Sequence, residues 1–205
     1  MTDLILSPTI ISGYQGLIFD MDGTLIDTMP AHEQAWVETG EYFGYPLNGE
    51  LMYQLSGATT YIIAEAIMRD GGMPLHLLEQ VVQKKRELGV QRVLQSAVLL
   101  PAFEIVRYFN GKIPMALGTG AHRSMTEILI EKFDLAHYFS AIVTSDDVLN
   151  HKPAADTFLR CAELLGVAPC DCLVFEDGDF GITASHAGAM DVFDVRDNRL
   201  LKAER

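Results

Sequence analysis

The sequence predicts an α/β fold: a Rossmann-like parallel sheet flanked by helices, with an all-helical segment inserted after the first strand. Two observations lead to this prediction. From residue 99 onward, short apolar runs alternate with helical patterns, and repeated strand and helix units form parallel sheets with right-handed crossovers. Residues 27–95, in contrast, have a helical pattern almost throughout and contain no convincing strand.

The first strand is expected at residues 17–19, which show no polar alternation, as in a central strand buried on both faces. Apolar spacing, with Pro and Gly at the ends, predicts helices in the insert over residues 30–43, 60–70 and 74–95. The elements expected after the insert are helix 102–109, strand 115–118, helix 125–133, strand 141–143, helix 156–165 capped by Asp156, strand 172–175, helix 182–187 and strand 192–195. The polar tail after Arg196 is expected to fray.

Length and composition limit the class of protein. A chain of 205 residues with 49% hydrophobic content fits one large domain or one domain with a modest insertion. The net charge of −13 argues against nucleic acids and anionic membranes as partners, because phosphate backbones demand a basic surface. Neither a signal peptide nor a transmembrane stretch is recognisable. Three cysteines without disulfide or zinc spacing indicate reduced thiols, so we expect a cytoplasmic protein. We also expect a monomer.

Two carboxylates follow the first strand. Asp20 lies at its carboxyl end, where ligands bind in open α/β sheets, and Asp22 comes two residues later. Gly23 permits a turn with positive φ, and Thr24 offers a hydroxyl and an N–H group to an anion. Two carboxylates packed against an apolar strand repel each other unless a cation or a proton intervenes, which indicates a divalent metal. The alternative is an ordinary Asp-Gly turn at the end of a strand.

Three later stretches carry polar groups of related chemistry. Thr119 lies ahead of a helix and can offer its hydroxyl and neighbouring amides, such as that of Gly120, to phosphate oxygens. Lys152, in a loop before a proline, could neutralise anions. Glu176 and Asp177 follow another buried strand and supply oxygen ligands of the kind that magnesium prefers. Taken singly, each stretch also has a purely structural explanation: Thr119 in a turn, Lys152 as a surface lysine, and the pair Glu176-Asp177 as a helix cap.

Together, these stretches resemble a known family. Residues 20–24, Asp-Met-Asp-Gly-Thr, are similar to the first signature of the haloacid dehalogenase-like phosphohydrolases. Thr119, Lys152 and the pair Glu176-Asp177 then follow in the order which that family requires. Within the family, the chain most resembles the β-phosphoglucomutase-like subfamily and its bacterial fructose-1-phosphate phosphatases.

The resemblance implies a Mg²⁺-dependent phosphatase that hydrolyses a small sugar phosphate, such as fructose-1-phosphate, through a phosphoaspartate on Asp20. Asp22 would act as the general acid and base. It also implies that Mg²⁺ is held by the Asp20 side chain, the Asp22 backbone carbonyl and Asp177, with Glu176 bound directly or through water. Thr119, Gly120 and Lys152 would bind the phosphate.

The helical insert is expected to be a cap domain, residues 28–95, over a core formed by residues 1–27 and 96–205. His32 would face the mouth of the site, where the resemblance assigns it to substrate contact or to linking cap closure with catalysis. Ser56 and Thr60 are neutral where the mutases of the subfamily carry basic residues, which favours simple hydrolysis. The basic stretch 84–86 could supply a basic contact to the substrate, but a solvated helix face is the expectation.

Two alternative functions remain at this stage. The first is a β-phosphoglucomutase-type hexose-phosphate mutase, which would share the same motifs. The second is a non-catalytic phospho-switch resembling receiver domains, which also combine an acceptor aspartate, a threonine and a lysine on a parallel sheet. Receiver domains place the acceptor after a middle strand and have no helical insert, so the order of the motifs speaks against this alternative.

Overall fold

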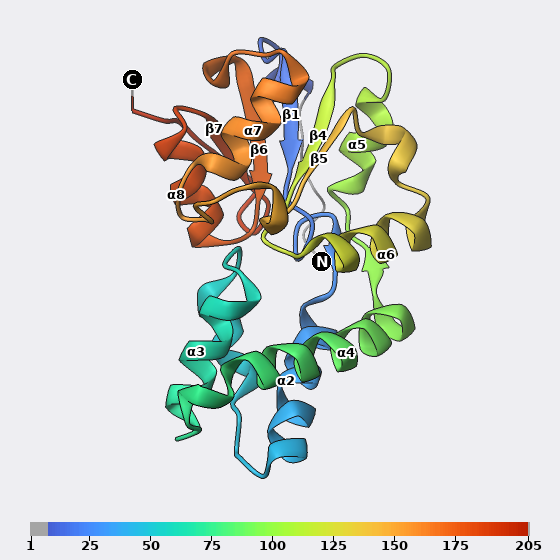
Figure 1. Ribbon diagram of the computed structural model, residues 1–205. Helices are drawn as coiled ribbons and strands as arrows, with labels where there is room; N and C mark the ends of the chain where they lie inside the picture. Colours follow the sequence, from blue (N-terminus) through green and yellow to red (C-terminus); the bar gives the residue numbers. More distant parts are fainter. Residues whose placement is uncertain (1–7, 205) are drawn as a thin grey trace.

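The computed structural model describes residues 8–204, and its helical insert lies below the carboxyl ends of the sheet strands (Figure 1). The expectation of no signal peptide depends on the amino terminus, of which residues 1–7 lie outside the described residues. Among residues 8–204, no helix combines the length and the apolar character needed to cross a membrane.

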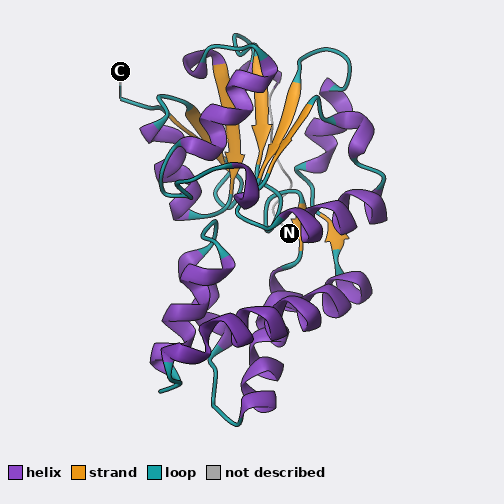
Figure 2. Ribbon diagram, in the orientation of Figure 1, coloured by secondary structure: helices purple, strands orange, loops and turns teal. Residues whose placement is uncertain are grey.

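The sheet has six strands in the order β5-β4-β1-β6-β7-β8. Their bounds are β1 Gly16–Phe19, β4 Met115–Gly118, β5 Ala141–Val143, β6 Cys172–Glu176, β7 Asp191–Asp194 and β8 Arg199–Leu201. β1 lies in the middle and pairs in parallel with β4 and β6, and its four residues are buried. The predicted parallel sheet with a central first strand is therefore confirmed. The carboxyl ends of β1, β4 and β6 meet at one edge, which faces the helical insert (Figure 2).

The tail after Arg196 does not fray, so that prediction is wrong. β8 pairs antiparallel with β7 and forms an edge of the sheet. At the start of β7, the buried carboxylate of Asp191 accepts hydrogen bonds from the Lys202 ammonium at 2.8 Å, the Ala203 amide at 3.0 Å and the Tyr14 hydroxyl at 2.6 Å. These long-range bonds order a polar segment whose own sequence gives no strand signal.

Helices cover both faces of the sheet (Figure 2). Their bounds are α1 Pro8–Ile11, α5 Phe103–Phe109, α6 Arg123–Phe133, α7 Asp156–Leu165 and α8 Asp179–Ala187, with short 3₁₀ turns at Ala136–Tyr138, Ser145–Asp147 and Pro169–Asp171. Leu17 and Phe19 of β1 belong to one apolar cluster, with residues of α5 and α6. Ile18 points to the other face, against residues of α7 and α8. The core thus consists of two layers separated by β1 and its neighbours.

The start of α7 differs from the prediction. Asp156 is the first residue of α7 instead of its cap, and Ala155 occupies the capping position without a side-chain hydrogen bond. The Asp156 carboxylate instead accepts a hydrogen bond of 2.9 Å from the Asn150 side chain. An acidic residue in the first turn still interacts favourably with the helix dipole.

The helical insert consists of α2 Met29–Phe43, α3 Thr60–Asp70 and α4 Leu78–Ser96, with 3₁₀ turns at Gly49–Leu55 and Leu75–Leu77. It has an apolar cluster of its own around Trp36, Ile67 and Val81. A two-stranded antiparallel ribbon, β2 Ile26–Asp27 and β3 Val98–Leu99, joins the insert to the sheet. The sequence did not predict this ribbon, because strands of two residues leave no periodic pattern.

Candidate active site

Asp20 and Lys152 form a buried ion pair at the carboxyl end of β1. The Lys152 ammonium lies 2.6 Å from Oδ1 of Asp20 and 2.8 Å from Oε2 of Glu176. Asp20 is 2% exposed and Lys152 1% exposed. The predicted alternative of a surface lysine is therefore wrong. The fold brings Lys152 across 132 positions of sequence to the end of the first strand.

Burial and charge act in opposite directions on this pair. Burial, with the neighbouring Glu176 carboxylate, raises the pKa of Asp20 well above its usual value, although Lys152 opposes the shift. Burial would lower the pKa of Lys152, but the two carboxylates outweigh it and raise that pKa. Two carboxylates share one lysine here, so their negative charge is only partly balanced and the cluster favours a further cation.

Glu176 and Asp177 extend the acidic cluster. Oε1 of Glu176 accepts the backbone amides of Asp177 and Gly178, at 3.0 and 2.9 Å, while Oε2 accepts from Lys152. Asp177 accepts the Thr24 hydroxyl at 2.8 Å on Oδ1 and the Ser56 hydroxyl at 3.0 Å on Oδ2. Burial, followed by the charge of Glu176, raises the pKa of Asp177 to about 7. Both carboxylates are thus held in fixed orientations.

Residues 20, 176 and 177 suit a hard divalent cation. One carboxylate oxygen from each lies within 4.8 Å of the others. An all-oxygen set of this kind is the chemistry that Mg²⁺ prefers. Gly23 contributes by its size and its φ of +83°, because a Cβ atom there would lie 2.4 Å from Oδ2 of Asp177. The side chain of Asp22 contacts Thr28 and His32 and not this cluster. The role of the Asp22 backbone carbonyl as a metal ligand stays a prediction.

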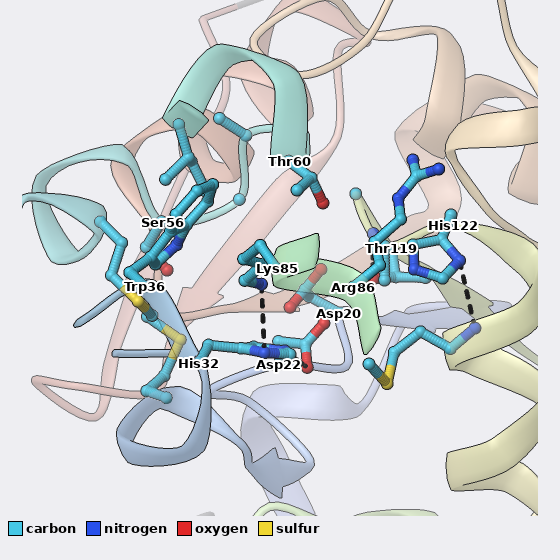
Figure 3. A pocket seen from close by; sticks show the side chains of 18 residues that line it. Asp20, Asp22, His32, Trp36, Ser56, Thr60, Lys85, Arg86, Thr119 and His122 are labelled. Carbon is cyan, nitrogen blue, oxygen red and sulfur yellow. Dashed lines mark hydrogen bonds and ion pairs between the residues drawn. The ribbon is translucent and has the colours of Figure 1, made fainter. Parts of the chain in front are cut away.

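A chain of polar contacts starts at Asp22. Its Oδ1 accepts the Thr28 hydroxyl at 2.5 Å and lies 3.6 Å from Nε2 of His32. Nδ1 of His32 lies 3.3 Å from the ammonium of Lys85, a contact drawn in Figure 3. Burial would raise the pKa of Asp22, but the contacts with His32 and Thr28 lower it overall. His32 therefore contacts the predicted acid and base directly, and it comes from α2 of the insert.

Thr119 and Gly120 complete the core side of the site. Thr119 follows β4, is 1% exposed, and its hydroxyl oxygen accepts the Ala121 amide at 3.0 Å. Both residues line the same cavity as Asp20 and Asp22 (Figure 3). His122 lies beside them at the start of α6, where burial and then the charge of Arg86 lower its pKa to about 4.

The cavity lies between the core and the helical insert (Figure 3). The insert side carries His32, Trp36, Ser56, Thr60, Lys85 and Arg86. Its volume of about 70 Å³ is far below the ~300–1,000 Å³ of typical ligand pockets. The helical insert and the core therefore leave little room between them in this structure.

The expectation that residues 84–86 form a solvated helix face is wrong for Lys85 and Arg86. Lys85 is 7% exposed, and burial lowers its pKa to about 8. The Nε atom of Arg86 is buried and has no hydrogen-bond partner among residues 8–204, and its guanidinium lies 5.5 Å from the centre of the Tyr61 ring. A signal was available for Lys85, because the buried residues of α4 recur at helical spacing through positions 81, 85, 89 and 93.

Comparison with known proteins agrees with this geometry. The family model of the haloacid dehalogenase-like hydrolases matches residues 14–188. An uncharacterized protein of Haemophilus influenzae is 50% identical over 94% of this chain and 96% of its own length. Fructose-1-phosphate phosphatase YqaB of Escherichia coli is 44% identical over 89% of this chain and 97% of its own.

Among solved structures, β-phosphoglucomutase of Clostridium difficile superposes with a TM-score of 0.76 at 21% identity, covering 88% of this chain and 84% of that one. At this identity the superposition shows a shared fold. The family match and the two sequence relatives establish more. The chain therefore belongs to the haloacid dehalogenase-like hydrolases, in the β-phosphoglucomutase-like subfamily, and is a phosphoric monoester hydrolase of that family.

Proposed function

We propose that this enzyme hydrolyses a monophosphorylated sugar of hexose or pentose size, with fructose-1-phosphate as the first candidate, through a phosphoaspartate on Asp20. The single observation that carries the proposal is the buried contact of 2.6 Å between Lys152 and Asp20, which lines the cavity. The Escherichia coli relative, 44% identical, supports the choice of substrate.

The side chains of the core support a two-step displacement. An Asp20 oxygen attacks phosphorus, the bond from phosphorus to the sugar oxygen breaks, and Asp22 gives its proton to that oxygen. Water then attacks the phosphoaspartate, Asp22 takes a proton from the water, and Asp20 is released with inorganic phosphate. Lys152, the Thr119 hydroxyl and the amide of Gly120 would bind the phosphate oxygens.

Asp20, Asp177 and the Asp22 carbonyl would hold Mg²⁺, with Glu176 bound directly or through water. Bound there, the ion would supply charge neutralisation, so that an anionic nucleophile and an anionic phosphate can meet. Both oxygens of Glu176 already accept hydrogen bonds from Lys152 and two backbone amides. This supports a role for Glu176 in holding Lys152 and the following loop beside the ion.

We also propose that residues 28–95 move as a cap over a core of residues 1–27 and 96–205. The ribbon of β2 and β3 is the connection between the two parts and is the natural hinge. Cap closure would bring His32 to Asp22 and exclude bulk water from the phosphoaspartate. The small volume of the cavity between the two parts, about 70 Å³, is consistent with this motion.

Two variants and one assay test the proposal. Purified protein with Mg²⁺ is expected to release phosphate from fructose-1-phosphate, and Asp20→Asn is expected to abolish release while the circular dichroism spectrum stays unchanged. A matched variant is Asp70→Asn, which alters an exposed acidic residue at the end of α3 and is expected to retain activity. Full activity of Asp20→Asn, or of the wild type in excess chelator, would contradict the mechanism.

The mutase remains a second candidate because of one observation. Lys85 and Arg86 place two cationic groups in the cavity, although Ser56 and Thr60 are neutral. Cations there could bind a second phosphate of the kind that a mutase substrate carries. Incubation with β-glucose-1-phosphate decides between the two functions: a phosphatase releases inorganic phosphate and glucose, whereas a mutase accumulates glucose-6-phosphate.

A further inference from the structure

A loop of the helical insert reaches into the catalytic edge of the core. Residues 56–58 connect the 3₁₀ turn Gly49–Leu55 to α3. A Cβ atom at Gly178 would lie 2.4 Å from the Ser56 carbonyl oxygen, and one at Gly120 would lie 2.7 Å from that of Gly57. Two core loops therefore approach this loop at distances that only glycine allows.

The Ser56 side chain makes a more specific contact. Its hydroxyl donates to Oδ2 of Asp177 at 3.0 Å, across 121 positions of sequence. The other oxygen of Asp177 accepts the hydroxyl of Thr24, which belongs to the core and is 1% exposed. One acidic side chain is thus held from two sides, by a core hydroxyl that is always present and by a hydroxyl of the insert.

We propose that Ser56 is a positioning residue that couples closure of the helical insert to divalent cation binding at Asp177. This inference rests on the proposed function, because it takes Asp177 as a metal ligand. In the closed arrangement, the two hydroxyls fix the plane of the carboxylate and leave a lone pair on each oxygen for a cation. When the insert swings away, Thr24 alone holds the carboxylate.

The coupling acts in both directions. If closure improves the affinity of Asp177 for the cation, the bound cation must favour closure by the same factor. A hydrogen bond to an ionised carboxylate contributes enough for about a tenfold change in affinity. Ser56 would therefore link substrate enclosure to metal occupancy through its hydrogen bond to Asp177.

Magnesium titration calorimetry of the substrate-free protein tests the proposal. Ser56→Ala is expected to weaken Mg²⁺ binding about tenfold, and Ser56→Thr, which keeps the hydroxyl, is expected to bind as the wild type does. Thr60→Val is the matched control, because it removes another cavity-lining hydroxyl of the insert that has no hydrogen bond to Asp177. Equal Mg²⁺ affinity in Ser56→Ala and wild type, or equal weakening in all three variants, would overturn the coupling.

Hydrogen exchange gives a second, independent measurement. In the wild type, Mg²⁺ is expected to slow amide exchange both in the core segment 176–180 and in the insert loop 55–59. In Ser56→Ala at saturating Mg²⁺, only the core segment is expected to be protected. Protection of both segments in that variant would refute the inference while leaving the proposed phosphatase intact. Absence of Mg²⁺ binding by the wild type would overturn both.

Discussion

Replacement of Lys152 by methionine tests how the active-site charges are balanced. The side chain is 1% exposed, and its ammonium contacts Asp20 at 2.6 Å and Glu176 at 2.8 Å. Methionine has a similar length and no charge, so Lys152→Met leaves two buried carboxylates without their shared cation. Removal of one partner from a buried ion pair costs about 3–5 kcal/mol.

For a domain of this size, each kcal/mol changes the melting temperature by about 2–4 °C. We therefore expect the metal-free variant to melt roughly 6–20 °C below the wild type. Urea denaturation in chelator, followed by circular dichroism, measures the free energy of unfolding directly. Addition of Mg²⁺ is expected to restore part of the loss, because the ion replaces the missing positive charge.

Two comparisons make this result interpretable. Lys112→Met changes an exposed lysine whose ammonium lies over the exposed ring of Tyr108, and it is expected to alter the free energy of unfolding by no more than about 1 kcal/mol. The double variant Asp20→Asn with Lys152→Met removes one of the unpaired carboxylates and is expected to recover about 1–3 kcal/mol. A stability of Lys152→Met within about 1 kcal/mol of the wild type would refute the reasoning.

Three further predictions concern cap closure, the acid and base, and the sheet edge. Gly120→Ala places a methyl group 2.7 Å from the carbonyl oxygen of Gly57 in the insert and should lower kcat/KM up to ~100-fold. The control is Gly111→Ala, at a glycine with positive φ and no atom of residues 8–204 close to the added methyl group. It should cost about 1 kcal/mol of stability and leave kcat/KM unchanged. Lys85→Met should lower kcat/KM by about 100-fold in a phosphate-release assay, yet leave the free energy of unfolding equal or higher, because a buried ammonium is removed. Burial would raise the pKa of Asp191, but the hydrogen bonds it accepts, the largest effect coming from Lys202, lower that pKa overall. The ionised carboxylate therefore stabilises the fold above a pH of about 3.9, the usual pKa of an aspartate in the unfolded chain. Asp191→Asn should cost about 1–3 kcal/mol at pH 7, and urea denaturation at pH 3 should show that difference shrinking; a constant difference would contradict the assignment.

The catalytic edge could be predicted because it depends on a local pattern repeated along the chain. Asp20, Thr119 and Asp177 each follow a buried apolar run, and parallel strands bring their carboxyl ends to one edge. Once the first strand is central, these side chains must converge. The same reasoning predicted the helical insert, since residues 27–95 contain no run with the pattern of a core strand.

The rest of the site depends on contacts between distant segments. Lys85 meets His32 across 53 positions, and Ser56 meets Asp177 across 121. A lysine beside other basic residues in a helix predicts a solvated face, and only the packing of α4 against α2 and the core buries it. Nothing near Ser56 in sequence indicates an acidic partner.

The sequence alone determined the α/β class, the order of the motifs and the identity of the acidic cluster, because periodicity and strand ends are local properties of the chain. Tertiary structure decided the edge strand β8, the two-stranded ribbon of β2 and β3, and the contacts that the insert makes with the core. They depend on pairing and hydrogen bonds between residues far apart in the chain, and no single segment of sequence encodes those contacts.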